Sequence, residues 1–131
     1  MGSWKVLVVD DDPDIRRIAA FSLGRIGGFE VATASGGDEA IAEVLRQLPD
    51  LVLLDVSMPG MDGPATLAAL HALPGAEGLP VVFFTATSSD AEVDRLRSLG
   101  AIGVLPKPFE VAELPKRIRA LGAQAGLHWD G

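Results

Sequence analysis

The sequence contains no cysteine, which removes one large group of structures and reactions from consideration. Without cysteine the chain forms no disulfide bond, has no thiolate nucleophile and offers no cysteine ligand to zinc. A chain of this kind is compatible with a reducing compartment. We therefore predict a cytoplasmic location.

Long apolar runs and positive charge are also scarce. No apolar stretch approaches the roughly 18 residues of a membrane-spanning helix, and no basic segment precedes an apolar one as in a secretory signal. Lysine and arginine number 11 against 18 aspartates and glutamates, so the formal net charge is −7 at pH 7. This charge disfavours direct binding to nucleic acid, which needs a basic surface. We expect neither membrane insertion nor direct contact with nucleic acid.

The chain does contain enough apolar material for one folded domain. It has 131 residues, of which 48% are hydrophobic, and its mean hydropathy is +0.30. These values exclude a disordered chain, and the length suits a single domain with a real core. Hydrophobic periodicity stops after Leu121. We predict a domain over residues 4–121 and a loose tail over residues 122–131.

Short apolar runs alternate with helical patterns throughout the domain. Four continuous runs are typical of strands buried on both faces, and they cover residues 6–9, 51–54, 81–84 and 104–105. Residues 29–32 alternate apolar and polar side chains instead, as an edge strand with one wet face does. Because every connection holds a helical pattern, we expect the strands to be parallel. The prediction is an α/β domain of the (βα)5 type.

Helix-capping patterns support these boundaries. Three helix starts are predicted, at Asp12 before Pro13, at Ser35 with Asp38, and at Ser89 with Glu92. The glycine pair 27–28 ends the first helix.

Polar side chains follow the ends of four predicted strands. Asp10, Asp11 and Asp12 follow the first, Asp55 follows the third, and Thr85 follows the fourth. Lys107 comes just after the fifth. Ligands of an open α/β sheet bind at the carboxyl ends of its strands, so these groups should meet at one edge. Carboxylates, a hydroxyl and an ammonium together suit a divalent cation and a phosphoryl group.

In these residues the chain resembles the response-regulator receiver domain of bacterial two-component signalling, of the chemotaxis type. The resemblance covers residues 4–121 and rests on four motifs in order, each at a strand end: VVDDDP at 8–13, LDVSMPGMDG at 54–63, TA at 85–86 and LPKPF at 105–109. It implies a flavodoxin-like, doubly wound parallel sheet with strand order 2-1-3-4-5. It also implies a cis peptide bond between Lys107 and Pro108.

The resemblance implies a role for each residue of the motifs. Asp55 would be the phosphoacceptor, Thr85 would hydrogen-bond the phosphoryl group, and Lys107 would pair with it. The cofactor would be Mg²⁺. Its implied ligands are Asp10, Asp11, Asp55 and the backbone carbonyl of Ser57.

Partners and a switch follow from the same resemblance. The phosphoryl donor would be a sensor histidine kinase or a histidine phosphotransfer protein. Phosphorylation would draw in the Thr85 hydroxyl and move residues 86–89 with the face made by the fourth helix, fifth strand and fifth helix. That face would contact a downstream protein target or a second copy of the chain. No output domain follows Leu121, so we expect a stand-alone regulator, acting as a switch or as a relay of phosphate. It would not be an enzyme beyond its own phosphorylation and slow dephosphorylation.

Two other functions remain open at this level. Val104 stands where most receivers carry an aromatic residue that moves on activation, which leaves room for a pseudo-receiver that binds partners without phosphorylation. Asp10 and Asp12 also form the D-x-D pattern of Mg²⁺-dependent phosphohydrolases with an aspartyl nucleophile. In that case Asp10 would be the nucleophile, and the motif around Asp55 would have no role.

Overall fold

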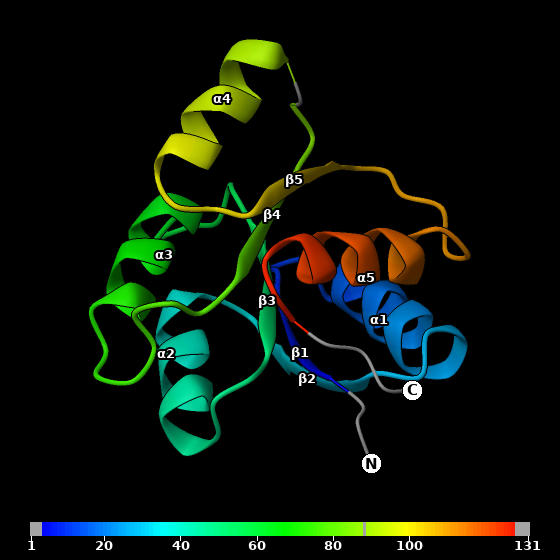
Figure 1. Ribbon diagram of the computed structural model, residues 1–131, viewed down its shortest axis with the longest axis horizontal. Helices are drawn as coiled ribbons and strands as arrows, with labels where there is room; N and C mark the ends of the chain where they lie inside the picture. The colour runs from blue at the N-terminus through cyan, green and yellow to red at the C-terminus, as the bar shows by residue number, and fades with distance from the viewer. Residues whose placement is uncertain (1–3, 88, 128–131) are drawn as a thin grey trace.

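A computed structural model describes residues 4–87 and 89–127 and contains one five-stranded parallel sheet with helices on both faces (Figure 1). The strands are β1 (Lys5–Val9), β2 (Glu30–Ala34), β3 (Leu51–Asp55), β4 (Val81–Thr85) and β5 (Gly103–Pro106). The helices are α1 (Pro13–Phe21) with its π-helical continuation η1 (Ser22–Ile26), α2 (Gly37–Arg46), α3 (Gly63–His71), α4 (Asp90–Ser98) and α5 (Leu114–Gln124). The strand order is β2-β1-β3-β4-β5, which confirms the predicted flavodoxin-like fold.

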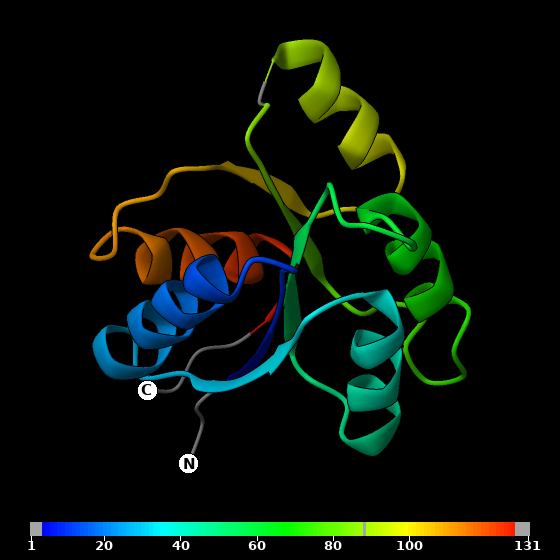
Figure 2. The same ribbon diagram turned by 180° about the vertical axis from the view of Figure 1, so that it is seen from behind.

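The sheet separates two hydrophobic cores because successive strand residues point to opposite faces. Leu7 and Val9 of β1 enter the core beneath α2, α3 and α4, whereas Val6 and Val8 enter the core beneath α1 and α5. Figures 1 and 2 show these two helical layers from opposite sides. The central strands β1, β3 and β4 are buried along their whole length, as their continuous apolar sequences predict.

Strand β2 lies one to two residues later than predicted. It covers Glu30–Ala34 and pairs with all of β1, in the register Lys5 to Glu30 through Val9 to Ala34. Phe29 precedes the strand, and its buried ring stacks on Trp4 with 5.7 Å between ring centroids. Alternation therefore identified an edge strand correctly but placed its bounds too early.

The capping predictions have mixed outcomes. Asp12 caps α1 by accepting from the amides of Asp14 and Ile15, and Ser89 caps α4 by accepting from Glu92. The predicted Ser35–Asp38 pair at α2 is wrong. The N-cap there is Gly36, and the Glu39 carboxylate reaches back to the Ser35 amide at 2.6 Å.

In the layer formed by α1 and α5, the C-terminal ends of both helices differ from those that hydrophobic periodicity predicts. The π-helical turn η1 places the buried Ser22 hydroxyl 2.5 Å from the Val111 carbonyl, in the loop before α5. Helix α5 continues to Gln124, three residues beyond its predicted end, and Gly122 in this last turn packs directly against the Trp4 ring. Residues 128–131 of the predicted tail lie outside the described residues. None of the described helices is long and apolar enough to cross a bilayer.

Candidate functional site

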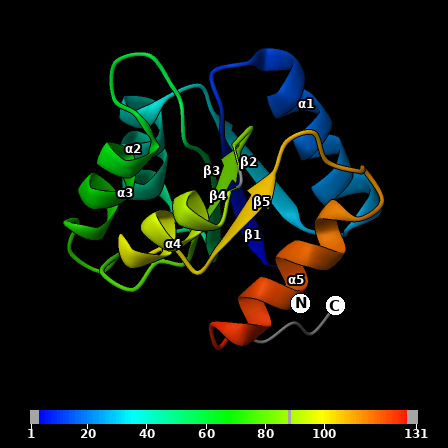
Figure 3. The ribbon, with the colours of Figure 1, turned by 90° about the horizontal axis from the view of Figure 1, so that it is seen from above.

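Four strand ends meet at one edge of the sheet (Figure 3). The register pairs Val9 with Leu54, and Thr85 with Pro106, so the residues that follow each strand lie side by side. They surround a cavity of about 290 Å³. Its lining residues are Asp10, Asp11, Asp12, Asp55, Ser57, Thr85, Ala86, Thr87 and Lys107. The structure therefore brings together every site residue predicted from the sequence.

Three carboxylates form the acidic side of this cavity. Oxygen atoms of Asp10, Asp11 and Asp55 all lie within 4.8 Å of one another. Asp10 is 0% exposed and Asp55 is 5% exposed, whereas Asp11 is open to solvent. No hydrogen-bond donor among the described residues reaches the buried Asp10 Oδ2 atom with good geometry. Oxygen ligands clustered this closely fit a hard divalent cation such as Mg²⁺.

Lys107 joins two of these carboxylates. Its Nζ atom lies 2.8 Å from Asp10 Oδ2 and 3.1 Å from Asp55 Oδ1, and its side chain is 18% exposed. Its backbone amide donates to the Thr85 carbonyl at 2.8 Å, which fixes the residue at the end of β5. The same ammonium lies 5.2 Å from the centroid of the Phe84 ring. Lys107 thus supplies a positive charge in the middle of the acidic cluster.

Burial and neighbouring charges shift two pKa values in the cavity. Burial raises the pKa of Asp55, and the Asp10 charge adds to this effect, although Lys107 and a backbone hydrogen bond from Ser57 oppose it. Burial by itself lowers the pKa of Lys107. The Asp10 and Asp55 carboxylates outweigh that effect, so its pKa is raised and it stays cationic at neutral pH.

The Thr85 hydroxyl is already occupied by its own loop. It donates to the Thr87 carbonyl at 3.0 Å and accepts from the Thr87 amide at 3.0 Å. A new hydrogen bond from this hydroxyl to a group at Asp55 has to replace the bond to the Thr87 carbonyl. The Thr85 hydroxyl therefore links the cavity to the loop after β4 through hydrogen bonds.

Comparison with known proteins assigns this arrangement to a family. The family model for the response regulator receiver domain matches residues 6–119. The chain belongs to that family. Receiver domains act in two-component signalling, and they bind Mg²⁺ at an acidic pocket such as the one formed here by Asp10, Asp11 and Asp55.

Individual relatives agree with this assignment. The transcriptional regulatory protein PrrA of Mycobacterium tuberculosis is 43% identical over 126 residues, which are 95% of this chain and 52% of PrrA. The receiver domain thus spans about half the length of the curated relatives it matches first. The chemotaxis protein CheY4 of Vibrio cholerae has a TM-score of 0.85 at 32% identity, covering 91% of this chain and 98% of CheY4. The N-terminal domain of a response regulator receiver protein from Methanoculleus marisnigri has a TM-score of 0.73 at 33% identity, covering 89% and 94%.

The loop after β3 places a glycine directly behind Asp55 of the receiver domain. Gly60 takes a φ of 77°, and Asp62 caps α3 by accepting from the Ala65 amide at 2.9 Å. A Cβ atom at Gly63 would lie 2.4 Å from the Asp55 carbonyl oxygen and 2.7 Å from Val56 Cα. Only glycine allows α3 to start this close to the strand end. The turn-rich sequence predicted a loop here but not the close approach.

We expect Gly63→Ala to damage both stability and the site. Backbone must move to admit the methyl group, and such overpacking typically costs 1–3 kcal/mol of unfolding free energy. Urea denaturation followed by circular dichroism measures this loss. The matched control is Gly78→Ala, since no atom lies within 4 Å of a Cβ at Gly78. Equal stability of the two variants would contradict the close packing at Asp55.

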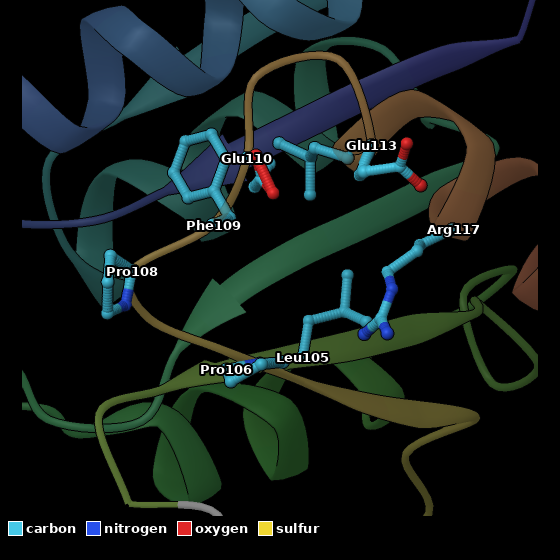
Figure 4. A pocket seen from close by; sticks show the side chains of 8 residues that line it. Leu105, Pro106, Pro108, Phe109, Glu110, Glu113 and Arg117 are labelled. Carbon is cyan, nitrogen blue, oxygen red and sulfur yellow. The ribbon is translucent and has the colours of Figure 1, made fainter.

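A second hollow of the receiver domain lies beside the acidic cavity, between β5, the following loop and α5 (Figure 4). It has a volume of about 240 Å³. Its lining residues are Leu105, Pro106, Pro108, Phe109, Glu110, Glu113, Leu114 and Arg117. The Lys107–Pro108 peptide bond, which adjoins it, is cis as predicted. None of the clustered aspartates lines this hollow, so the candidate functional site is the acidic cavity.

Two contacts of the site were not predicted from the sequence. Phe84 lies under Lys107, and Arg16 donates from Nη1 to the Asp10 carbonyl at 2.6 Å. Phe84 reads as an ordinary strand residue, and Arg16 reads as one of two adjacent arginines on a helix. Neither pattern signals a contact with the cavity.

Proposed function

We propose that this receiver domain accepts a phosphoryl group on Asp55 from a phosphohistidine of a sensor histidine kinase or a histidine phosphotransfer protein. One observation carries the proposal: Lys107 bridges Asp10 and Asp55 while Asp11 stands at the open side of the same cluster. A buried carboxylate that accepts phosphate needs nearby positive charge, because carboxylate and phosphoryl oxygens repel each other.

Mg²⁺ would be held by the carboxylates of Asp10, Asp11 and Asp55 and by the Ser57 carbonyl. When bound, it would offset the negative charge of the carboxylates and the phosphoryl oxygens. By resemblance to the family, Asp11 would be a direct ligand and Asp10 would contact the ion through water.

The transfer itself is a simple exchange of bonds. An Asp55 oxygen attacks phosphorus, a new P–O bond forms, and the P–N bond to the donor histidine breaks. Lys107, released from its bridge, pairs with the phosphoryl oxygens and stabilises the charge that moves onto Asp55. The acyl phosphate later hydrolyses, which resets the domain. The chain is in this sense an acceptor rather than an enzyme that turns over a substrate.

Phosphorylation would reach a partner through Thr85. Its hydroxyl would exchange the Thr87 carbonyl for a phosphoryl oxygen, which moves the loop at residues 86–89; Ser88 lies outside the described residues. The loop leads into α4, which with β5 and α5 forms the proposed contact face. Val104 on that face is half-buried and packs on the core, so the switch operates without an aromatic side chain.

The partner on this face is proposed to be a protein target or a second copy of the chain. The net charge of −7 supports a protein rather than nucleic acid. The relatives include transcriptional regulators, but this chain spans only half their length. Switch and relay roles are separated by mixing the phosphorylated chain with a histidine phosphotransfer protein. Phosphate returns to the histidine in a relay and stays on Asp55 in a switch.

Intact-mass analysis with acetyl phosphate tests the proposal. We expect wild type to gain one phosphoryl group only when Mg²⁺ is present, and to lose it over time after the donor is removed. Chelation of Mg²⁺ should abolish the gain. A wild-type chain that stays unmodified with acetyl phosphate and also with a phosphorylated kinase would support a pseudo-receiver instead.

We also expect Mg²⁺ to stabilise the domain without any phosphoryl donor. A ligand that binds only the folded state adds about 1.4 kcal/mol at ten times its dissociation constant, which raises the melting temperature by about 4 °C in a domain of this size. Thermal unfolding at constant ionic strength measures the shift. Asp11→Asn should reduce it, because this substitution removes the exposed carboxylate of the cluster. An equal shift with NaCl would mean that charge screening alone is responsible.

A further inference from the structure

Three of the four polar atoms of Asp10 are hydrogen-bonded within the protein, and the fourth, Oδ2, forms an ion pair with Lys107. Its amide donates to the Ala34 carbonyl at 3.1 Å, and its Oδ1 atom accepts from the Asp12 amide at 2.9 Å. Lys107 lies at Oδ2. The remaining atom is the backbone carbonyl oxygen, which accepts from Arg16 Nη1 at 2.6 Å. Among the described residues, Arg16 is the side chain that hydrogen-bonds the carbonyl of the peptide between Asp10 and Asp11.

Arg16 also spans the turn that carries these acids. Its own amide donates to the Asp12 carbonyl at 3.0 Å, as part of the first turn of α1. The amide and the side chain of Arg16 therefore hydrogen-bond the carbonyl groups at the two ends of segment 10–12. Asp11, which lies between these two contacts, is exposed.

The neighbouring arginine provides an internal comparison. Arg17 contacts Asp14 at 3.2 Å on the outer surface of α1, and its side chain is 74% exposed. Arg16 is half-buried and turns back toward the sheet. These two adjacent arginines therefore differ in exposure and in hydrogen-bond partner, and of the two it is Arg16 that contacts Asp10.

We propose that Arg16 is a positioning residue for the Mg²⁺ site: it fixes the Asp10–Asp11 peptide so that both carboxylates face the same point. This inference rests on the proposed function, because it presupposes that Mg²⁺ binds there. Groups that orient metal ligands typically change metal affinity by 10–100-fold when removed. Charge acts in the opposite direction, since a cation near the site repels Mg²⁺ and its removal strengthens binding. The sign of the effect therefore separates positioning from simple electrostatics.

The test is calorimetric titration of Mg²⁺ into the unphosphorylated full chain. We expect roughly 10-fold weaker binding for Arg16→Met than for Arg17→Met, which should match wild type. Arg16→Lys keeps one donor and should recover part of the affinity. Melting curves recorded in a chelator show the stability of each variant without metal, so a lower stability is read separately from a weaker affinity.

Several outcomes would overturn the inference. Equal or tighter Mg²⁺ binding by Arg16→Met, with wild type binding normally, would leave the proposed function intact and exclude a positioning role. A lower melting temperature in chelator with unchanged Mg²⁺ affinity would show that Arg16 only stabilises the fold. Absence of Mg²⁺ binding by wild type itself would overturn the proposed function together with this inference.

Discussion

We expect the Asp55→Asn variant to take up no phosphoryl group from acetyl phosphate or from a phosphorylated partner. An amide has no anionic oxygen to attack phosphorus. Intact-mass analysis under conditions that modify wild type measures the loss. Asp12→Asn is the matched control, because Asp12 lines the same cavity and asparagine caps a helix as well as aspartate does. Loss of labelling in both variants would argue against a specific acceptor.

The same substitution should stabilise the fold at neutral pH. Because burial raises the pKa of Asp55, the folded chain binds this proton more tightly than the unfolded chain. The resulting stabilisation is fully present below the unfolded pKa and is lost as the pH rises through the raised folded pKa. At pH 7 the ionised carboxylate is therefore unfavourable, and Asp55→Asn should melt a few degrees higher. The difference in melting temperature between Asp55→Asn and wild type should shrink as the pH falls toward the titration range of Asp55.

We expect Lys107→Met to cause the largest loss of stability among the site variants. Removing one partner of a buried ion pair leaves uncompensated charge, which costs about 3 kcal/mol. Here two carboxylates, Asp10 and Asp55, would remain close together without the ammonium between them. Urea denaturation at pH 7 measures the effect, and Mg²⁺ should restore more stability to this variant than to wild type.

Two further variants define the cause of that loss. Lys116→Met removes a lysine whose side chain is 68% exposed and pairs only at the surface with Glu113, so its stability should stay close to wild type. Combining Lys107→Met with Asp10→Asn should recover part of the loss, because one of the two unpaired charges is gone. If Lys107→Met proved as stable as Lys116→Met, the ion pairs of Lys107 with Asp10 and Asp55 would not contribute to the stability of the fold.

The location of the site followed from the sequence because it depends on a simple geometric rule. Continuous apolar runs identified β1, β3 and β4, and parallel strands place their carboxyl ends at one edge. Asp10, Asp55 and Thr85 therefore had to meet once the strands were recognised. Their chemical roles required the family resemblance, since a carboxylate at a strand end is by itself compatible with several functions.

Other features could not be read from local patterns. The contacts of Arg16 with Asp10 and of Ser22 with Val111 join residues through space, and no periodicity reports them. At α2, Ser35 with Asp38 matched a capping pattern, but the strand continues to Ala34 and the N-cap of the helix is Gly36 instead. Local sequence preference allows more than one structure at each of these positions, and the structure that forms depends on tertiary packing.

The assignment of Asp55 as the acceptor is tested most directly by locating the phosphoryl group on the wild-type chain. The chain is incubated with acetyl phosphate and Mg²⁺, and borohydride then reduces the acyl phosphate so that the modified aspartate becomes homoserine. Tandem mass spectrometry of the digest identifies its position. We predict homoserine at position 55 and at no other aspartate. Homoserine at position 10 would contradict the receiver mechanism proposed here and would support an aspartyl phosphohydrolase in its place.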